Sequence, residues 1–202
     1  MTALSGARWR AGFGHYRMQW VYNVHIPRAQ EILGVERKVH TAEHLASAIF
    51  YLGAPIGEIP RAKLAIQPAA RGAQRAIIHA VAATPEKTWP AERFLDVARH
   101  LHGLGIEPVF VGGAADDLSA FAAYQTVRGS DLKELLSAAT LFIGNDSGPA
   151  HMAAAAGLPV VVLFGVSDPA IWGPWRTAGQ VLPLSASSAD VIEALSRLRV
   201  AA

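Results

Sequence analysis

The chain has 202 residues, of which 51% are hydrophobic and none is cysteine. This length provides one main hydrophobic core with an appendage, and the lack of cysteine excludes disulfides, thiolate metal sites and cysteine nucleophiles. No apolar run approaches the ~20 residues that cross a bilayer, and the N-terminus shows no signal-peptide pattern, so we expect a soluble, cytoplasmic protein.

The net charge of +2 is distributed unevenly along the chain. Residues 1–75 hold ten basic and four acidic side chains, whereas residues 76–202 hold eight basic and twelve acidic ones. Two interpretations of the basic segment stay open, namely contact with an anionic acceptor or membrane surface, and a solvated basic face. Nucleic-acid binding is not expected, because the basic residues are scattered rather than clustered with aromatic residues.

From residue 75 onward, short apolar runs alternate with helical patterns. The predicted strands lack polar alternation, as expected for strands buried on both faces, and they span residues 76–79, 108–111, 141–143 and 159–164. The predicted helices span residues 91–101, 132–139, about 149–156 and 189–198. This order predicts an open, doubly wound α/β fold with a Rossmann-like parallel sheet.

Residues 1–65 lack this alternation and form the predicted appendage and linker, whereas residues 66–202 form the predicted main domain. Aromatic side chains are frequent in residues 8–28, and residues 41–52 predict a helix whose inward face holds Leu45, Ile49 and Leu52. A segment this short cannot bury its own aromatic residues. We therefore expect it to pack on the main domain or on another chain.

The most informative stretch runs from Leu141 to Ala155, where a strand, a tight polar turn and a helix follow one another. Ligands of open α/β sheets bind at the carboxyl ends of strands, where helix N-termini expose unpaired amides. A diphosphate suits this position. Ser147 is expected to cap the helix and offer a hydroxyl, Gly148 to let the backbone approach closely, and Pro149 to start the first turn. The alternative is a plain helix N-cap without a ligand.

The turn is the first of three motifs in this part of the chain. Residues 145–151 read Asn-Asp-Ser-Gly-Pro-Ala-His, residues 157–159 read Gly-Leu-Pro, and residues 163–169 read Leu-Phe-Gly-Val-Ser-Asp-Pro. Together they resemble glycosyltransferase family 9, the ADP-heptose:lipopolysaccharide heptosyltransferases. Glu-Lys-Thr-Trp-Pro at residues 86–90 is similar to the family's phosphate-binding lysine and Trp-Pro helix start, and residues 111–116 are similar to its glycine turn followed by an acidic residue.

The resemblance implies that residues 66–202 are the nucleotide-sugar-binding half of a GT-B transferase, and that residues 1–65 are a remnant of its acceptor domain. It implies a donor site in which Lys87 neutralises phosphate charge and Thr84 is a weaker phosphate candidate. The remaining implied donor residues are Asp146, Ser147, Gly148, Pro149 and His151. Asp116 and Ser130 are candidates for the nucleoside region. The plain alternatives are an exposed lysine for Lys87 and a helix cap for Asp116.

The resemblance further implies inverting transfer of a heptose from ADP-heptose to a lipopolysaccharide core acceptor. The family's general base is expected in a Gly-Asp loop that this chain lacks, so no catalytic residue is assigned, and we expect little or no transfer by these 202 residues alone. Many family members carry Pro-Gly between the first strand of this domain and the loop that follows it, and this chain has Ala80 and Val81 there. One alternative function is a non-catalytic nucleotide-binding or interaction module that pairs with another chain through residues 1–60. A sugar epimerase, or a transferase that uses a different nucleotide, is a further alternative.

No metal or cofactor is expected. His40, Glu43 and His44 lie near one helical face, a geometry that zinc could use, but solvated histidines at a helix start capped by Thr41 are the preferred interpretation. Neither the dinucleotide-binding glycine motif nor a P-loop occurs, which disfavours dehydrogenases and P-loop enzymes.

Overall fold

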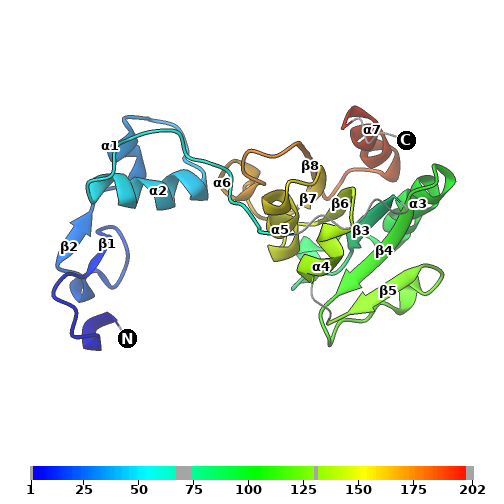
Figure 1. Ribbon diagram of the computed structural model, residues 1–202, viewed down its shortest axis with the longest axis horizontal. Coiled ribbons are helices and arrows are strands. Elements are labelled where there is room, and N and C mark those ends of the chain that lie inside the picture. The colour runs from blue at the N-terminus through cyan, green and yellow to red at the C-terminus, as the bar shows by residue number, and fades with distance from the viewer. Residues whose placement is uncertain (1, 67–73, 130–131, 199–202) are drawn as a thin grey trace. The chain divides into compact units, whose positions relative to one another are not determined.

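The computed structural model describes residues 2–66, 74–129 and 132–198 (Figure 1). The chain forms two compact units. The N-terminal unit comprises the chain up to Pro60 together with Ala170–Trp172, and the sheet unit comprises Arg61–Pro169 and the chain from Gly173 onward. None of the helices in the described parts of the chain is long and apolar enough to cross a membrane.

The sheet unit contains six parallel strands in the order β5-β4-β3-β6-β7-β8 (Figure 1). Their bounds are β3 (Arg75–His79), β4 (Glu107–Gly112), β5 (Gln125–Arg128), β6 (Leu141–Asn145), β7 (Val160–Phe164) and β8 (Gly179–Pro183). The predicted doubly wound parallel sheet is confirmed. Strands β5 and β8 were not predicted, because both are edge strands with exposed residues and carry no continuous apolar run.

Helices cover both faces of this sheet. Successive residues of β3 point to opposite faces, so that Ile78 packs with α3 (Ala91–Gly103) and α7 (Ser188–Arg197). On the other face Ile77 packs with α4 (Leu132–Ser137) and α5 (Gly148–Ala156). Shorter helical turns are η3 (Pro85–Lys87), η4 (Ser119–Phe121) and α6 (Pro169–Trp172). The two layers bury the central strands β6 and β7 completely and leave the carboxyl ends of the strands for a ligand.

The N-terminal unit is small and contains little regular structure. Its elements are η1 (Thr2–Leu4), β1 (Ala11–Phe13), η2 (Gln19–Val21), β2 (Val24–Ile26), α1 (Ala29–Leu33) and α2 (Thr41–Tyr51). Strands β1 and β2 pair in parallel. The ring of Phe13 stacks on His44 with centroids 3.9 Å apart, and Tyr16 Oη lies 3.0 Å from His44 Nε2. Burial lowers the pKa of His44, and the nearby His15 lowers it further.

The prediction for the inward face of α2 is wrong. Leu45, Ile49 and Leu52 are 61%, 58% and 56% exposed, whereas Glu43 and Ser47 are buried. The described part of the chain packs α2 by its small and polar side, and it provides no cover for the apolar side. The apolar spacing therefore identified a helix correctly but placed its buried face on the wrong side.

The start of α2 also differs from the prediction, because His40 rather than Thr41 is the N-cap. His40 Nδ1 accepts a hydrogen bond from Ala42 N at 3.1 Å, and the Glu43 carboxylate accepts one from His40 N at 2.8 Å. Hydrogen bonding from the Arg37 guanidinium lowers the pKa of Glu43 to about 2. Since the usual value is 4.5, this pair favours the fold above that pH, and its contribution is lost as the pH falls through about 2.

The possible zinc ligands thus have other partners in the fold. His40 caps α2, Glu43 pairs with Arg37, and His44 stacks on Phe13. Within the described ranges, no group of three or more histidine and acidic side chains is placed to hold a metal ion.

Candidate functional site

The strand order fixes where a ligand can bind. Strands β3 and β6 are neighbours, and the chain continues outward from β3 to β4 on one side and from β6 to β7 on the other. The resulting crevice at the carboxyl ends of β3 and β6 is the usual ligand site of doubly wound sheets. His79 ends β3 and Asn145 ends β6, so residues that directly follow these two lie at the crevice.

Helix α5 begins at this crevice, as predicted, with Gly148 and Pro149 in its first turn. Ser147 occupies the N-cap position, but the prediction that its side chain caps the helix is wrong. Ser147 Oγ instead donates to Asn145 O at 3.0 Å and lies 3.3 Å from His79 Nδ1. The hydroxyl is turned back toward the two strand ends, so the Ser147 side chain does not cap the first amides of α5.

His79, at the end of β3, is linked to Asn145, at the end of β6, through the Ser147 hydroxyl. Burial lowers its pKa, and the negative charge of Asp116 opposes this effect only in part. The imidazole is therefore neutral at neutral pH. Because the Ser147 hydroxyl proton is directed to Asn145 O, an Nδ1–H of His79 is the group that donates to Ser147 Oγ.

Lys87 and Asp146, two predicted donor-site residues, lie side by side. Lys87 ends η3, and its Nζ is 3.8 Å from Asp146 Oδ2. The lysine side chain is 34% exposed and the aspartate side chain 11% exposed. The carboxylate thus holds an accessible ammonium next to the residues that open α5.

Asn145 is the polar residue that fixes this arrangement, and the sequence analysis did not assign it to the site. Its side chain is fully buried, with Nδ2 donating to Ala80 O at 3.0 Å and Oδ1 accepting from Trp89 N at 2.9 Å. Ala80 and Trp89 flank the segment that carries Lys87. The amide therefore ties both ends of this segment to the end of β6. A polar side chain at the end of an apolar strand was the available sequence signal.

Gly165, which follows β7, was also missed as a site residue. A Cβ atom at this position would lie 2.3 Å from Glu86 O, so only glycine allows the two backbones to approach this closely. Glu86 is the immediate neighbour of Lys87. The loop after β7 therefore contacts the segment after β3 and closes one side of the crevice.

On the other side of β3, the turn after β4 borders a cavity of about 260 Å³. Asp116 Oδ2 accepts from Gly113 N at 2.7 Å and closes this turn. The residues that line the cavity are His79, Val111, Gly112, Gly113, Gly129, Leu132, Leu135 and Pro149. The cavity thus combines glycine backbone, two leucines and the first turn of α5, and it adjoins the crevice through His79.

Comparison with known proteins agrees with this geometry. The family model described as "Glycosyltransferase family 9 (heptosyltransferase)" matches residues 1–197. The chain belongs to glycosyltransferase family 9. Lipopolysaccharide heptosyltransferase 3 of Escherichia coli is 37% identical over 103 residues, which are 44% of this chain and 30% of that protein. The chain thus spans about a third of this curated relative.

Two solved heptosyltransferases of E. coli share the fold. The structure of ADP-heptose lps heptosyltransferase II matches with a TM-score of 0.70 and 20% identity, covering 96% of this chain and 70% of that one. The structure of heptosyltransferase WaaC with ADP matches with a TM-score of 0.60 and 19% identity, covering 89% of this chain and 61% of that one.

Most of the residues that the family resemblance implies lie around the family 9 crevice. The segments after β3 and β6 bring together Lys87, Asp146, Ser147, Gly148 and Pro149. His151 lies one turn into α5 and is exposed. The Thr84 side chain forms a hydrogen bond with Glu86. The pKa of Glu86 is lowered mainly by a hydrogen bond from its own backbone amide and next by this bond from Thr84. Ser130 lies outside the described residues. The ligand roles of these residues stay predictions.

We predict that Asn145→Asp destabilises the chain in a pH-dependent way. At neutral pH the introduced carboxylate cannot donate to Ala80 O, and a buried unsatisfied or charged group costs about 1–3 kcal/mol or more. Protonation of the introduced carboxyl restores a donor, so the deficit should shrink as the pH falls. Urea unfolding from pH 5 to pH 8, relative to the wild-type protein at each pH, measures this effect.

Asn145→Ala is the matched control, because it removes both hydrogen bonds and introduces no titratable group. Its deficit should not shrink on acidification. Equal stability of Asn145→Asp and the wild type at every pH would show that the amide does not hold the segment.

Proposed function

We propose that the sheet unit binds the diphosphate of a nucleotide sugar, with ADP-heptose as the donor. The supporting observation is the placement of the Lys87 ammonium, 3.8 Å from Asp146, near the start of α5 at the switch point of the sheet, where the Ser147 side chain does not cap the helix. A helix N-terminus offers backbone amides and the positive end of its dipole to an anion. The exposed dipole contributes only ~0.3–1 kcal/mol, so direct hydrogen bonds and the lysine supply most of the affinity.

The individual roles follow from the contacts in the crevice. Lys87 pairs with the diphosphate, and the Ser147 hydroxyl turns from Asn145 O to a phosphate oxygen. Asp146 is a carboxylate and repels phosphate, so its role is to hold the lysine and to accept hydrogen bonds from sugar hydroxyls. His151, one turn further along α5, faces the phosphates or the sugar.

Gly148 also supports a phosphate site at the start of α5. A Cβ atom at this position would meet no other part of the chain, and its backbone does not adopt the left-handed conformation that favours glycine. Neither packing nor backbone geometry therefore requires a glycine here. Close approach of a phosphate to the first turn of α5 provides a reason for it.

The cavity of about 260 Å³ beside His79 is the proposed nucleoside site. Leu132 and Leu135 offer an apolar wall to a flat base, and Asp116 lies at the turn where a carboxylate can accept from a ribose hydroxyl. The solved structure of E. coli heptosyltransferase WaaC with ADP favours adenine as the base. Ser130 belongs to the same proposal on the family resemblance alone.

The proposed reaction is an inverting transfer of heptose to a lipopolysaccharide core acceptor. An acceptor hydroxyl forms a bond to the anomeric carbon, the bond from that carbon to the diphosphate oxygen breaks, and ADP leaves with the bonding electrons. Lys87 stabilises the negative charge that grows on the departing oxygen. The hydroxyl proton goes to a general base, which typically contributes ~10²–10⁴-fold and is expected in an acceptor half.

Residues 1–65 are proposed to belong to this acceptor half. The reaction takes place in the cytoplasm, with peripheral contact to the inner membrane where the acceptor resides. A second candidate function is a non-catalytic nucleotide-binding module that pairs with another chain through residues 1–60. The exposed side chains of Trp9 and Trp20 favour this second candidate, because exposed apolar surface often marks an interface.

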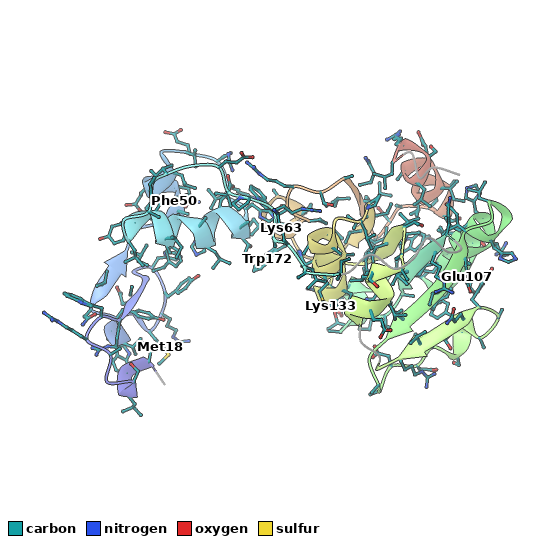
Figure 2. All side chains as sticks on the ribbon, viewed as in Figure 1. Met18, Phe50, Lys63, Glu107, Lys133 and Trp172 are labelled. Atoms are coloured by element: carbon teal, nitrogen blue, oxygen red, sulfur yellow. The ribbon has the colours of Figure 1, made fainter. Side chains whose placement is uncertain are left out.

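We predict that ADP binds this chain more tightly than UDP or GDP, and that Lys87→Ala weakens ADP binding about 10- to 100-fold. This range corresponds to the loss of one hydrogen bond to a charged group, about 1.5–3 kcal/mol. Calorimetric titration measures both effects. Lys63→Ala, which removes an exposed lysine elsewhere in the sheet unit (labelled in Figure 2), should leave the affinity unchanged. Equal heats for the wild type and Lys87→Ala would remove the assignment of the donor site.

Gly148→Ala is expected to weaken ADP binding without lowering stability. The added methyl group meets open space within the chain, and alanine is the better helix former, so the melting temperature should stay equal or rise. The methyl group would, however, stand between the phosphate and the first amides of α5. Thermal unfolding and calorimetry on the same preparation separate the two effects. Unchanged affinity would contradict close phosphate approach at Gly148.

We further predict that the purified 202-residue chain binds ADP but transfers little or no heptose to lipopolysaccharide core acceptor. The reason is the expected absence of a general base, since none of its residues is assigned this role. Mass spectrometry of the acceptor after incubation with ADP-heptose measures the transfer. Turnover at the rates usual for enzymes, about 1 s⁻¹ or more, would contradict the prediction.

A further inference from the structure

The ring of His79 borders both regions of the proposed site, the start of α5 and the nucleoside cavity. Its Nδ1 lies 3.3 Å from Ser147 Oγ at the start of α5, and the same side chain lines the cavity of about 260 Å³ beside the turn after β4. Strand β3 lies between β4 and β6 in the sheet (Figure 1), so a side chain at its carboxyl end can reach both regions. A group bound in the cavity can therefore act on Ser147 through this ring.

The neighbouring strand leaves room for the ring in this position. His79 pairs with Gly144 of β6, and a Cβ atom at Gly144 would lie 3.1 Å from His79 Cβ and 2.9 Å from His79 O. Both distances are shorter than an ordinary van der Waals contact. The glycine thus leaves the His79 side chain free to extend past the end of β6 to Ser147.

The hydrogen bonds of Ser147 determine which ring nitrogen carries the proton. Ser147 Oγ donates its only proton to Asn145 O, so the oxygen accepts from His79 Nδ1–H. Burial lowers the pKa of His79, and a neutral ring with its proton on Nδ1 has a lone pair on Nε2. Within the described residues Nε2 has no hydrogen-bond partner, and Asp116 acts on the ring through its charge alone. The ring therefore has a free acceptor for a ligand.

We propose that His79 determines nucleotide specificity: Nε2 accepts a hydrogen bond from a donor group of the nucleoside, while Nδ1–H holds the Ser147 oxygen and leaves the hydroxyl proton for a phosphate. This role depends on the function proposed above, because it assigns a specificity-determining residue to the same site. The donor groups that adenosine offers are the amine of its base and the two hydroxyls of its ribose.

A nucleoside that presents an acceptor to Nε2 disturbs both contacts. To donate to a carbonyl oxygen, the neutral ring must carry its proton on Nε2, and Nδ1 then becomes an acceptor. Either the Ser147 hydroxyl gives its proton to Nδ1 and loses it for the phosphate, or two lone pairs face each other across 3.3 Å. Each outcome leaves a polar group without its partner, which lowers the affinity. A base with a carbonyl group at this position is therefore disfavoured.

Calorimetric titration of the purified chain with ADP and three analogues tests this role. Inosine diphosphate replaces the adenine amine by a carbonyl group, and 2′-deoxy-ADP and 3′-deoxy-ADP each lack one ribose hydroxyl. If the amine donates to Nε2, inosine diphosphate should bind at least about tenfold more weakly than ADP. If a ribose hydroxyl is the donor, the analogue that lacks this hydroxyl should show the loss instead.

His79→Asn separates a ligand contact from a purely structural role. The asparagine amide can still donate to Ser147 from the position of Nδ1, but it has no atom at the position of Nε2. ADP should therefore bind this variant more weakly, and the discriminated analogue should bind it within about threefold of ADP. A residue that only stabilised the fold would weaken all four nucleotides alike and leave the wild-type preference unchanged.

Inorganic pyrophosphate, which has no nucleoside, tests the link to Ser147. It should bind His79→Asn as it binds the wild type, because the donor to the Ser147 oxygen is retained. His79→Phe, which removes both ring nitrogens, should bind pyrophosphate at least about threefold more weakly. In a Ser147→Ala background the same substitution should have a smaller effect, since the hydroxyl is then absent. Equal effects in the two backgrounds would contradict the link.

His102→Asn is the matched control, because it makes the same exchange at an exposed histidine of α3. It should leave every affinity unchanged. Equal binding of all four nucleotides to the wild type, or an unchanged preference in His79→Asn, would overturn the role of His79. If ADP binding still depended on Lys87, the proposed function would stand in that case. A wild-type chain that does not bind ADP would overturn both.

Discussion

The geometry of the crevice depends on one buried amide. Asn145 ends β6 and bonds through its side chain to Ala80 and Trp89, which are 65 and 56 residues away in the sequence. These bonds attach both ends of the segment between Ala80 and Trp89 to the end of β6. Buried polar networks cost stability when one partner is lost. The amide therefore makes the position of Lys87 a property of the folded core rather than of a surface loop.

The charged and polar side chains around the crevice lie on the segments that Asn145 holds together. Lys87 stands next to Asp146, and His79 is kept neutral by burial while it bonds to Ser147. Under the proposed function, an arriving diphosphate meets the accessible ammonium of Lys87 and the first amides of α5, which the Ser147 side chain does not cap. Asp146 already holds the lysine beside the start of α5. Such preorganisation reduces the entropic cost of binding.

The sequence predicted those parts of the fold that local patterns determine. Four continuous apolar runs identified β3, β4, β6 and β7, because strands buried on both faces need apolar residues throughout. Gly148 and Pro149 marked the start of α5 correctly. The edge strands β5 and β8 were not predicted, because their partly exposed residues form no apolar run that would distinguish them from a loop.

The features that the sequence did not predict depend on contacts between distant residues. The bonds of Asn145 and the close approach of Gly165 to Glu86 become visible only when the segments after β3, β6 and β7 are brought together. The capping of α2 by His40 rather than Thr41 depends on a reciprocal bond with Glu43. The buried side of α2 was wrong for another reason, since the spacing of apolar residues identifies a face without identifying what covers it.

The two units differ in how completely each buries its apolar residues. In the sheet unit, two clusters of apolar residues cover both faces of the sheet, and the central strands β6 and β7 are fully buried. The N-terminal unit buries few apolar side chains, among them Phe13, Val21 and Ile26. It leaves Leu45 and Ile49 of α2 more than half exposed. Small folds with little core depend on further contacts for stability. Under the proposed function, nucleotide recognition therefore rests on the well-buried core of the sheet unit.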